Sequence, residues 1–219
     1  MVSCETARRI IKEDDPYLKI ALASDVQIPR ECECEILGKL LEEKGEFYEP
    51  AIREKIANRR HISKECACDI LNKLASDEDI DVRANVASNG NIPKECACEI
   101  LNKLSKDEYS YVRISVTSNK NIPKECAYEI FSKLARDKDE HVRESVALSE
   151  NIPKECAYEI LSKLARDKNW TVRQSVASNS DIPEECACDI FSILLRDDDA
   201  FVRDAVEDNP LYRRLCRKK

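Results

Sequence analysis

The stretch Asn91-Ile92-Pro93-Lys94-Glu95-Cys96-Ala97 decides the fold, because the chain repeats it at a fixed interval. It returns 30 residues later as Asn121 to Ala127, then as Asn151 to Ala157, and then as Asp181 to Ala187 with Asp181 and Glu184 as the only changes. A fixed unit of about 20–50 residues is typical of stacked supersecondary units, none of which buries its apolar face alone. The sequence therefore predicts an elongated repeat protein.

The composition favours helices and narrows the class of partner. The chain has 219 residues, of which 42% are hydrophobic and 36% charged, and it has only three glycines. Its net charge of −7 opposes binding to a phosphate backbone, so we expect no nucleic-acid partner. No apolar run approaches the length of a membrane span, and no leader of the basic and apolar kind opens the sequence. We therefore expect a cytoplasmic protein with no membrane partner.

Residues 77–106 show how one unit is built. Asp77-Glu78-Asp79 offers carboxylates to the start of a first helix, whose apolar residues follow at helical spacing and which ends near residues 88–90. Pro93 suits the first turn of a second helix. One face of that helix is apolar over three turns, at Ile92, Cys96, Ile100, Leu101 and Leu104. We refer to the two helices as helix A and helix B.

The same template divides the chain into one continuous domain of repeats over 1–219. We expect a capping helix over 1–12, repeats over about 14–42, 47–76, 77–106, 107–136, 137–166 and 167–196, and a C-terminal half-repeat and cap over 197–219. Glu42 to Pro50 is predicted to be a longer loop. Leu211 or Leu215 is predicted to fold back as part of the cap.

The string Asp-x-Asp-x-x-Val-Arg-x-x-Val-Ala-Ser-Asn of residues 77–89, followed by Ile-Pro-x-Glu of residues 92–95, resembles HEAT-like repeats. It is most similar to the variant leucine-rich repeats. The resemblance implies an all-α fold: a right-handed α-solenoid of stacked two-helix HEAT-like repeats of about 30 residues. The unit is longer than the usual variant leucine-rich unit, and the family's N-terminal four-cysteine iron–sulfur segment is missing. This fold class serves many unrelated tasks, so it does not determine a function.

In each repeat from residue 77 on, an Asp at the start of helix A is followed six residues later by an Arg, which lies about one turn inside the helix. We predict a structural ladder in which each Arg bridges its own Asp and the Asp or Asn of a neighbouring unit. The ladder is predicted to be missing from the first unit, where Lys19 replaces Arg, and to lack its acid at Phe47 in the second. Its members are Asp77, Arg83, Asp107, Arg113, Asp137, Arg143, Asp167, Arg173, Asp197 and Arg203.

The twelve cysteines fall mostly into two columns of helix B. Cys32, Cys66, Cys96, Cys126, Cys156 and Cys186 form the first column, which we predict to be reduced and buried. Cys34, Cys68, Cys98 and Cys188 form a second, exposed column, in which Tyr128 and Tyr158 replace Cys. Residues two apart on a helix point about 200° apart, and packed helices lie about 8–10 Å apart, so we expect neither shared metal ligands nor disulfides. Metal, iron–sulfur or redox chemistry at the second column is the alternative.

No catalytic constellation is visible in the sequence. His61 and His141 are single and far apart, and no zinc-protease, catalytic-triad or phosphate-loop motif occurs. We expect no enzyme activity, no cofactor and no metal. The alternative is a HEAT-like enzyme subunit, for example one that is similar to a bilin lyase.

The positions that the repeat leaves variable gather at the start of helix A. Aromatic and imidazole side chains stand there in several units, at Tyr109, Tyr111, His141, Trp170 and Phe201. One interpretation is neutral variation at solvated positions. The other is a row of anchors for a partner protein. We predict a monomeric, non-catalytic scaffold or adaptor that binds another protein through these residues.

Overall fold

The computed structural model describes residues 2–13, 15–24, 26–43 and 48–217, and these residues are all-α, with fifteen helices and no strand. The chain divides into two compact units, Met1–Leu104 with Asn119–Asn121, and Ser105–Ser118 with Ile122–Lys219. Part of the predicted longer loop, including Phe47, lies outside the described residues. No helix of the described chain has the length and apolar character needed to cross a membrane.

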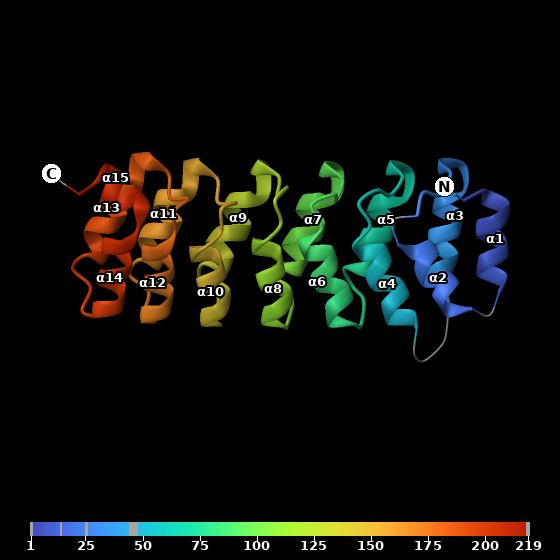
Figure 1. Ribbon diagram of the computed structural model, residues 1–219, viewed down its shortest axis with the longest axis horizontal. Helices are drawn as coiled ribbons and strands as arrows, with labels where there is room; N and C mark the ends of the chain where they lie inside the picture. Colours follow the sequence, from blue (N-terminus) through green and yellow to red (C-terminus); the bar gives the residue numbers. More distant parts are fainter. Residues whose placement is uncertain (1, 14, 25, 44–47, 218–219) are drawn as a thin grey trace. The chain divides into compact units, whose positions relative to one another are not determined.

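The first unit contains seven helices (Figure 1). They are α1 (Cys4–Lys12), α2 (Pro16–Ala23), α3 (Arg30–Leu40), α4 (Glu49–Ala57), α5 (Lys64–Leu74), α6 (Ile80–Ser88) and α7 (Lys94–Leu104). The even-numbered helices pack on one another in sequence order, and so do the odd-numbered ones. The unit therefore has two layers, which we call the A layer for the even helices and the B layer for the odd helices.

The second unit repeats this arrangement (Figure 1). Its helices are α8 (Ser110–Thr117), α9 (Lys124–Leu134), α10 (Glu140–Ala147), α11 (Lys154–Leu164), α12 (Trp170–Ser178), α13 (Glu184–Leu194), α14 (Ala200–Asp208) and α15 (Pro210–Leu215). In the A layer α8, α10, α12 and α14 pack in order, and α9, α11, α13 and α15 form the B layer. Leu211 of α15 is buried and Leu215 is exposed, so Leu211 is the residue that closes this end of the unit.

Each helix pair forms for the local reasons that its sequence shows. Asp79 caps α6, because its carboxylate accepts the N–H of Asp81 at 2.8 Å and that of Val82 at 3.3 Å. Val82 and Val86 are then buried on one side of the helix. α7 begins directly after Pro93 and buries the apolar face predicted for it, including Ile100 and Leu104. Burying one such side chain stabilises the fold by about 1.5–3 kcal/mol.

Arginine side chains tie the starts of neighbouring A-layer helices together. The Arg143 guanidinium donates two hydrogen bonds to the Asp167 carboxylate, from Nε at 2.7 Å and from Nη2 at 3.0 Å. Its Nη1 donates to the backbone carbonyl of Asp137 at 2.8 Å. Each guanidinium therefore joins the carboxylate of the next repeat to the backbone, and not the carboxylate, of its own Asp. The same bidentate contact to the following repeat joins Arg113 to Asp137 and Arg173 to Asp197.

The first repeats keep the same tie with different residues. Arg53 Nε lies 2.7 Å from Asp77 Oδ2. Lys19 Nζ lies 2.7 Å from Glu43 Oε2, with the same separation of 24 residues that joins Arg143 to Asp167. The prediction that the ladder is missing from the first unit was therefore wrong. Lys19 replaces the guanidinium by a point charge, which still holds one carboxylate but cannot make the bidentate contact.

Asparagine side chains tie the ends of the A-layer helices. Asn89 donates to the carbonyls of Ala57 at 2.7 Å and Arg59 at 3.2 Å, while its Oδ1 accepts the N–H of Asn91 at 2.8 Å. Asn179 donates in the same way to the carbonyl of Ala147 at 2.7 Å. The last carbonyls of a helix have no partner within it, so this column satisfies groups that would otherwise be buried without a hydrogen bond.

The ladder makes a prediction about stability. Arg143→Ala removes the donor from a mostly buried carboxylate, whereas Lys138→Ala removes only an exposed side chain. We expect the first variant to lower the free energy of unfolding by about 1–3 kcal/mol more than the second. Chemical denaturation followed by circular dichroism measures the difference. Equal midpoints would contradict a stabilising role for the ladder.

The stability difference between wild type and Arg143→Ala should also depend on pH. Burial raises the pKa of Asp167 and the Arg143 hydrogen bonds lower it, with a net pKa below its ordinary value. A lowered pKa in the folded state contributes stability that is present above the unfolded pKa of about 3.9 and is lost as the pH falls through the folded pKa. The difference between wild type and Arg143→Ala should therefore be full at neutral pH and shrink in strong acid.

Candidate functional site

The residues predicted to bind a partner lie at the starts of A-layer helices in the second unit. Tyr111, His141, Trp170 and Phe201 are in the first turns of α8, α10, α12 and α14, and Tyr109 directly precedes α8. All five are exposed: the exposed fraction is 64% for Phe201 and 41% for Trp170. The structure therefore shows that these side chains are not part of the core.

The structure brings two of these residues into contact. The rings of Trp170 and Phe201, from adjacent helices α12 and α14, have centroids 5.8 Å apart and planes inclined by 35°. His141 instead contacts Glu144 of its own helix, with Nδ1 and Oε2 3.2 Å apart. That hydrogen bond to the Glu144 carboxylate raises the pKa of His141. We call Trp170 and Phe201 the aromatic pair.

Tyr109 occupies a position where four other repeats use a helix cap. Asp79, Asp139, Asn169 and Asp199 stand at the equivalent positions, and each accepts a backbone N–H from the first turn of its helix. Tyr109 makes no such side-chain cap at the start of α8. Losing a cap of this kind costs about 0.5–2 kcal/mol, so an exposed Tyr here departs from what the helix alone favours.

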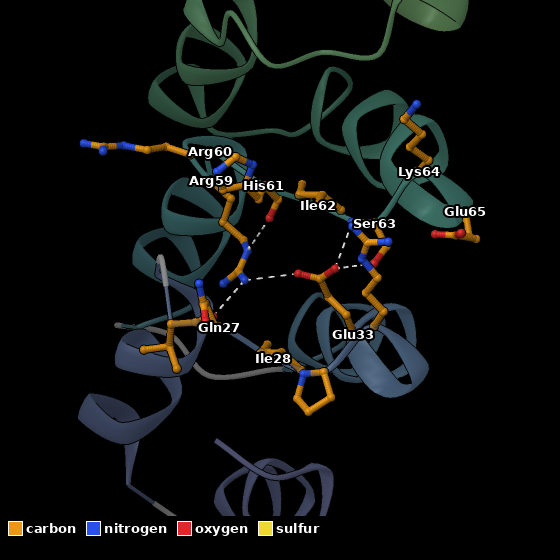
Figure 2. Close-up of a pocket in the computed structure, with 13 residues that line it drawn as sticks. Gln27, Ile28, Glu33, Arg59, Arg60, His61, Ile62, Ser63, Lys64 and Glu65 are labelled. Carbon is orange, nitrogen blue, oxygen red and sulfur yellow. Dashed lines mark hydrogen bonds and ion pairs between the residues drawn. The ribbon is translucent and has the colours of Figure 1, made fainter. Parts of the chain in front are cut away.

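A hollow of about 920 Å³ lies in the first unit, among the segments that lead into α3 and α5. It is lined by residues 26–30, Glu33 and residues 59–65. Figure 2 shows Arg59 and Glu33 pointing toward each other across it, while Arg60, Lys64 and Glu65 point away from that pair. Arg59 and Glu33 are both buried, and Arg59 Nη2 lies 3.2 Å from Glu33 Oε1.

The polar groups of this hollow have a structural explanation. Arg59 stands in the asparagine column and donates to the carbonyls of Leu22 and Ala23, both at 3.2 Å, as Asn does elsewhere. Ser63 stands where later repeats have Pro and therefore has an N–H, which donates to Glu33 Oε2 at 2.8 Å. Glu33 in turn replaces the Ala of the other repeats, such as Ala67. Arg59, Glu33 and Ser63 therefore provide one another's hydrogen-bond partners. We assign this network a role in stabilising the fold.

The prediction that the cysteines of the first column are reduced was wrong for four of them, since Cys32, Cys66, Cys96 and Cys126 are disulfide-bonded. Disulfides join Cys4 to Cys32, Cys34 to Cys66, Cys68 to Cys96, and Cys188 to Cys216. Their Cα atoms are 5.4–6.0 Å apart. Helix axes about 8–10 Å apart allow this, because each Cα lies about 2.3 Å from its axis and facing residues approach more closely than the axes do. The distance between facing Cα atoms, and not the distance between helix axes, decides whether a disulfide fits.

The two cysteine columns face opposite neighbours within the B layer. Cys32 bonds back to α1 and Cys34 bonds forward to α5, because residues two apart point about 200° apart on the helix. The same orientation that prevents a shared metal site therefore allows a chain of disulfides. The alternative of metal or iron–sulfur chemistry loses Cys34, Cys68 and Cys188 as free ligands. The disulfides also oppose the expected cytoplasmic location, because a reducing cytoplasm keeps thiols reduced.

Cys156 and Cys186 are free and buried, as predicted for the first column. Their partners in the disulfide pattern would stand at positions 128 and 158, where the chain has Tyr128 and Tyr158. Burial raises the pKa of both thiols. A raised pKa leaves little thiolate at neutral pH, so neither is a reactive cysteine.

Carboxylates of Glu54, Asp79 and Asp81 are the side chains grouped closely enough to share a cation within the described parts of the chain. Burial and the two neighbouring aspartates raise the pKa of Glu54. Asp79 is already engaged as the cap of α6. The group is therefore explained by helix capping, with a repulsive neighbour on α4.

Comparison of the chain with models of known protein families and with curated proteins finds no match.

The network around Glu33 makes a prediction that uses the chain's own repeats as the reference. Glu33→Ala leaves the Arg59 charge buried without its carboxylate, which should destabilise the first unit by about 3–5 kcal/mol. The triple variant Glu33→Ala, Arg59→Asn, Ser63→Pro copies the residues of later repeats and should recover most of that loss. Urea denaturation followed by circular dichroism measures both. A triple variant as unstable as Glu33→Ala would contradict the interpretation that these three residues together replace those of the later repeats.

The disulfide pattern predicts where a new disulfide can form. Tyr128→Cys places a thiol at the position that pairs, 28 residues later, with Cys156, as Cys68 pairs with Cys96. We expect an oxidised 128–156 pair and a stabilisation of about 2–4 kcal/mol. Peptide mapping without reduction detects the pair, and Tyr111→Cys, which faces no such partner, is the control. A Cys156 that still reacts with thiol reagents after denaturation would show the pattern to be wrong.

Proposed function

We propose that this protein is a non-catalytic scaffold, a right-handed α-solenoid of HEAT-like repeats that binds another protein through the A-layer surface of its second unit. The observation that carries the proposal is the aromatic pair. Two large rings from different helices contact each other, with centroids 5.8 Å apart, while both remain exposed to solvent. Aromatic residues are enriched among the anchors that dominate interface energies.

Two further observations support a binding role for this surface. The backbone beneath it is fixed by the guanidinium contact between Arg173 and Asp197, which ties α12 to the segment that leads into α14. A rigid display lowers the entropy that binding costs. Tyr109, which takes the place of a helix cap, extends the exposed aromatic residues to α8. Sequences depart from local rules mainly at functional sites.

The test is a variant that removes the anchors without touching the core. Trp170→Ala, Tyr111→Ala, Phe201→Ala should leave helicity and the melting temperature nearly unchanged, because all three side chains are exposed. It should abolish capture of a partner that the wild-type protein retains in an affinity pull-down. Truncated anchors typically cost about 2 kcal/mol or more each, enough together to lose a micromolar complex.

The control is Tyr128→Ala, Tyr158→Ala, which removes exposed aromatic side chains from the B layer of the same unit. It should retain the partner. A triple variant that folds and still binds would place the partner elsewhere, and one that unfolds would place these rings in the core. Sedimentation of the free protein tests the proposed monomer.

A further inference from the structure

α14 differs from the other A-layer helices of its unit by an excess of acidic residues near Phe201. Residues 197–208 contain six acidic residues and one basic residue, whereas the equivalent residues 167–178 contain one acidic and two basic residues. The five added carboxylates stand where the preceding repeat has Lys168, Asn169, Gln174, Ala177 and Ser178. They are Asp198, Asp199, Asp204, Glu207 and Asp208.

Three of these carboxylates, Asp198, Asp204 and Glu207, have no internal task, and the first two lie within three residues of Phe201 in the sequence. Asp198 and Asp204 are exposed, and neither side chain has a hydrogen-bond or ion-pair partner within the described part of the chain. Asp204 lies three residues after Phe201, so the two side chains share one face of α14. By contrast, Asp197 holds Arg173, and the Asp199 carboxylate caps α14 by accepting the N–H of Phe201 at 2.8 Å.

Exposed aromatic rings beside unpaired carboxylates favour a cation. The face of an aromatic ring attracts a guanidinium or ammonium group, with Trp the strongest partner, and a nearby carboxylate adds a charge-assisted hydrogen bond. We infer that the aromatic pair, with Asp198 and Asp204, binds a basic peptide segment of the partner through its arginine or lysine side chains. This inference rests on the proposed function and adds the chemistry of the partner.

The competing explanation is that α14 is acidic only because it lies near the end of the repeats. Terminal repeats carry polar outer faces that keep the protein soluble. A solubilising face does not account for Phe201, which is the most exposed aromatic residue of the surface at 64%. Nor does it account for six acidic residues against one basic residue in this segment, since solubilising faces mix both signs.

Trp170 makes the inference directly measurable, because it is the single tryptophan of the chain. The probe is a short unstructured peptide of arginine and glycine, titrated against the intact protein at low salt while Trp170 emission is recorded. We expect a saturable change in emission and weaker binding as the ionic strength rises. The same peptide with glutamate in place of arginine should give no change.

Variants separate a defined site from general charge attraction. The double variant Asp198→Asn, Asp204→Asn removes the carboxylates and should weaken binding of the arginine peptide about tenfold. Phe201→Ala removes an aromatic face and should weaken binding by the same factor. The control Asp181→Asn, Asp189→Asn removes the same charge from exposed positions of the same unit outside α14 and should bind as wild type. Equal weakening by the two double variants, or no emission change at all, would overturn the inference.

The outcome also distinguishes this inference from the proposed function. A captured partner that is lost with the anchor variant but binds Asp198→Asn, Asp204→Asn as tightly as wild type would leave the scaffold intact and refute a basic segment. If the free protein self-associates and loses that self-association in Asp198→Asn, Asp204→Asn, the occupant is a second copy of this chain, and the inference of a basic segment on another protein is also refuted.

Discussion

The structure depends on the contacts that hold the short helices of the A layer at both of their ends. These helices have eight or nine residues, which is below the length at which an isolated helix is stable in water. Their first turns are tied by guanidinium–carboxylate contacts such as Arg143 to Asp167, and their last carbonyls accept from asparagine side chains such as Asn179. Since each tie reaches a neighbouring repeat, a helix is stable only when its neighbour is in place. Packing between repeats and local helix formation are therefore one process.

The helix pairs could be predicted from the sequence because their signals are local. Asp79 caps α6 and Pro93 precedes α7, where propensity and apolar spacing agree. The ties could not be predicted in full, because they join residues of different repeats. The contact of Lys19 with Glu43 follows the separation of 24 residues that joins one repeat to the next, whereas the sequence displays most clearly the spacing of six within a repeat. The aromatic residues were predicted to lie at one edge, but only coordinates show that Trp170 and Phe201 touch.

The disulfides were missed for a geometric reason, and they change how the protein is understood. In the first unit they join α1, α3, α5 and α7 in succession, so the B layer there is a covalently linked series. Disulfides of this density persist in oxidising compartments and in the intracellular proteins of hyperthermophiles. In the second unit Tyr128 and Tyr158 interrupt the series and leave Cys156 and Cys186 as thiols. Between α9 and α13 the B layer therefore relies on packing and on polar contacts such as the hydrogen bond that Tyr128 donates to Glu159 at 2.8 Å.

Residues that depart from the repeat pattern are informative, because the contacts that the repeats share are complete without them. Glu33, Arg59 and Ser63 are departures that hydrogen-bond with one another, so no ligand is needed to explain them. Asp198 and Asp204 are different, because the ladder and the cap of α14 are already complete through Asp197 and Asp199. Their carboxylates have no partner within the described part of the chain, and each residue lies three positions from the exposed Phe201 in the sequence. Unpaired carboxylates near an exposed aromatic ring attract a cation, which is the chemistry that we infer for the partner of the second unit's A layer.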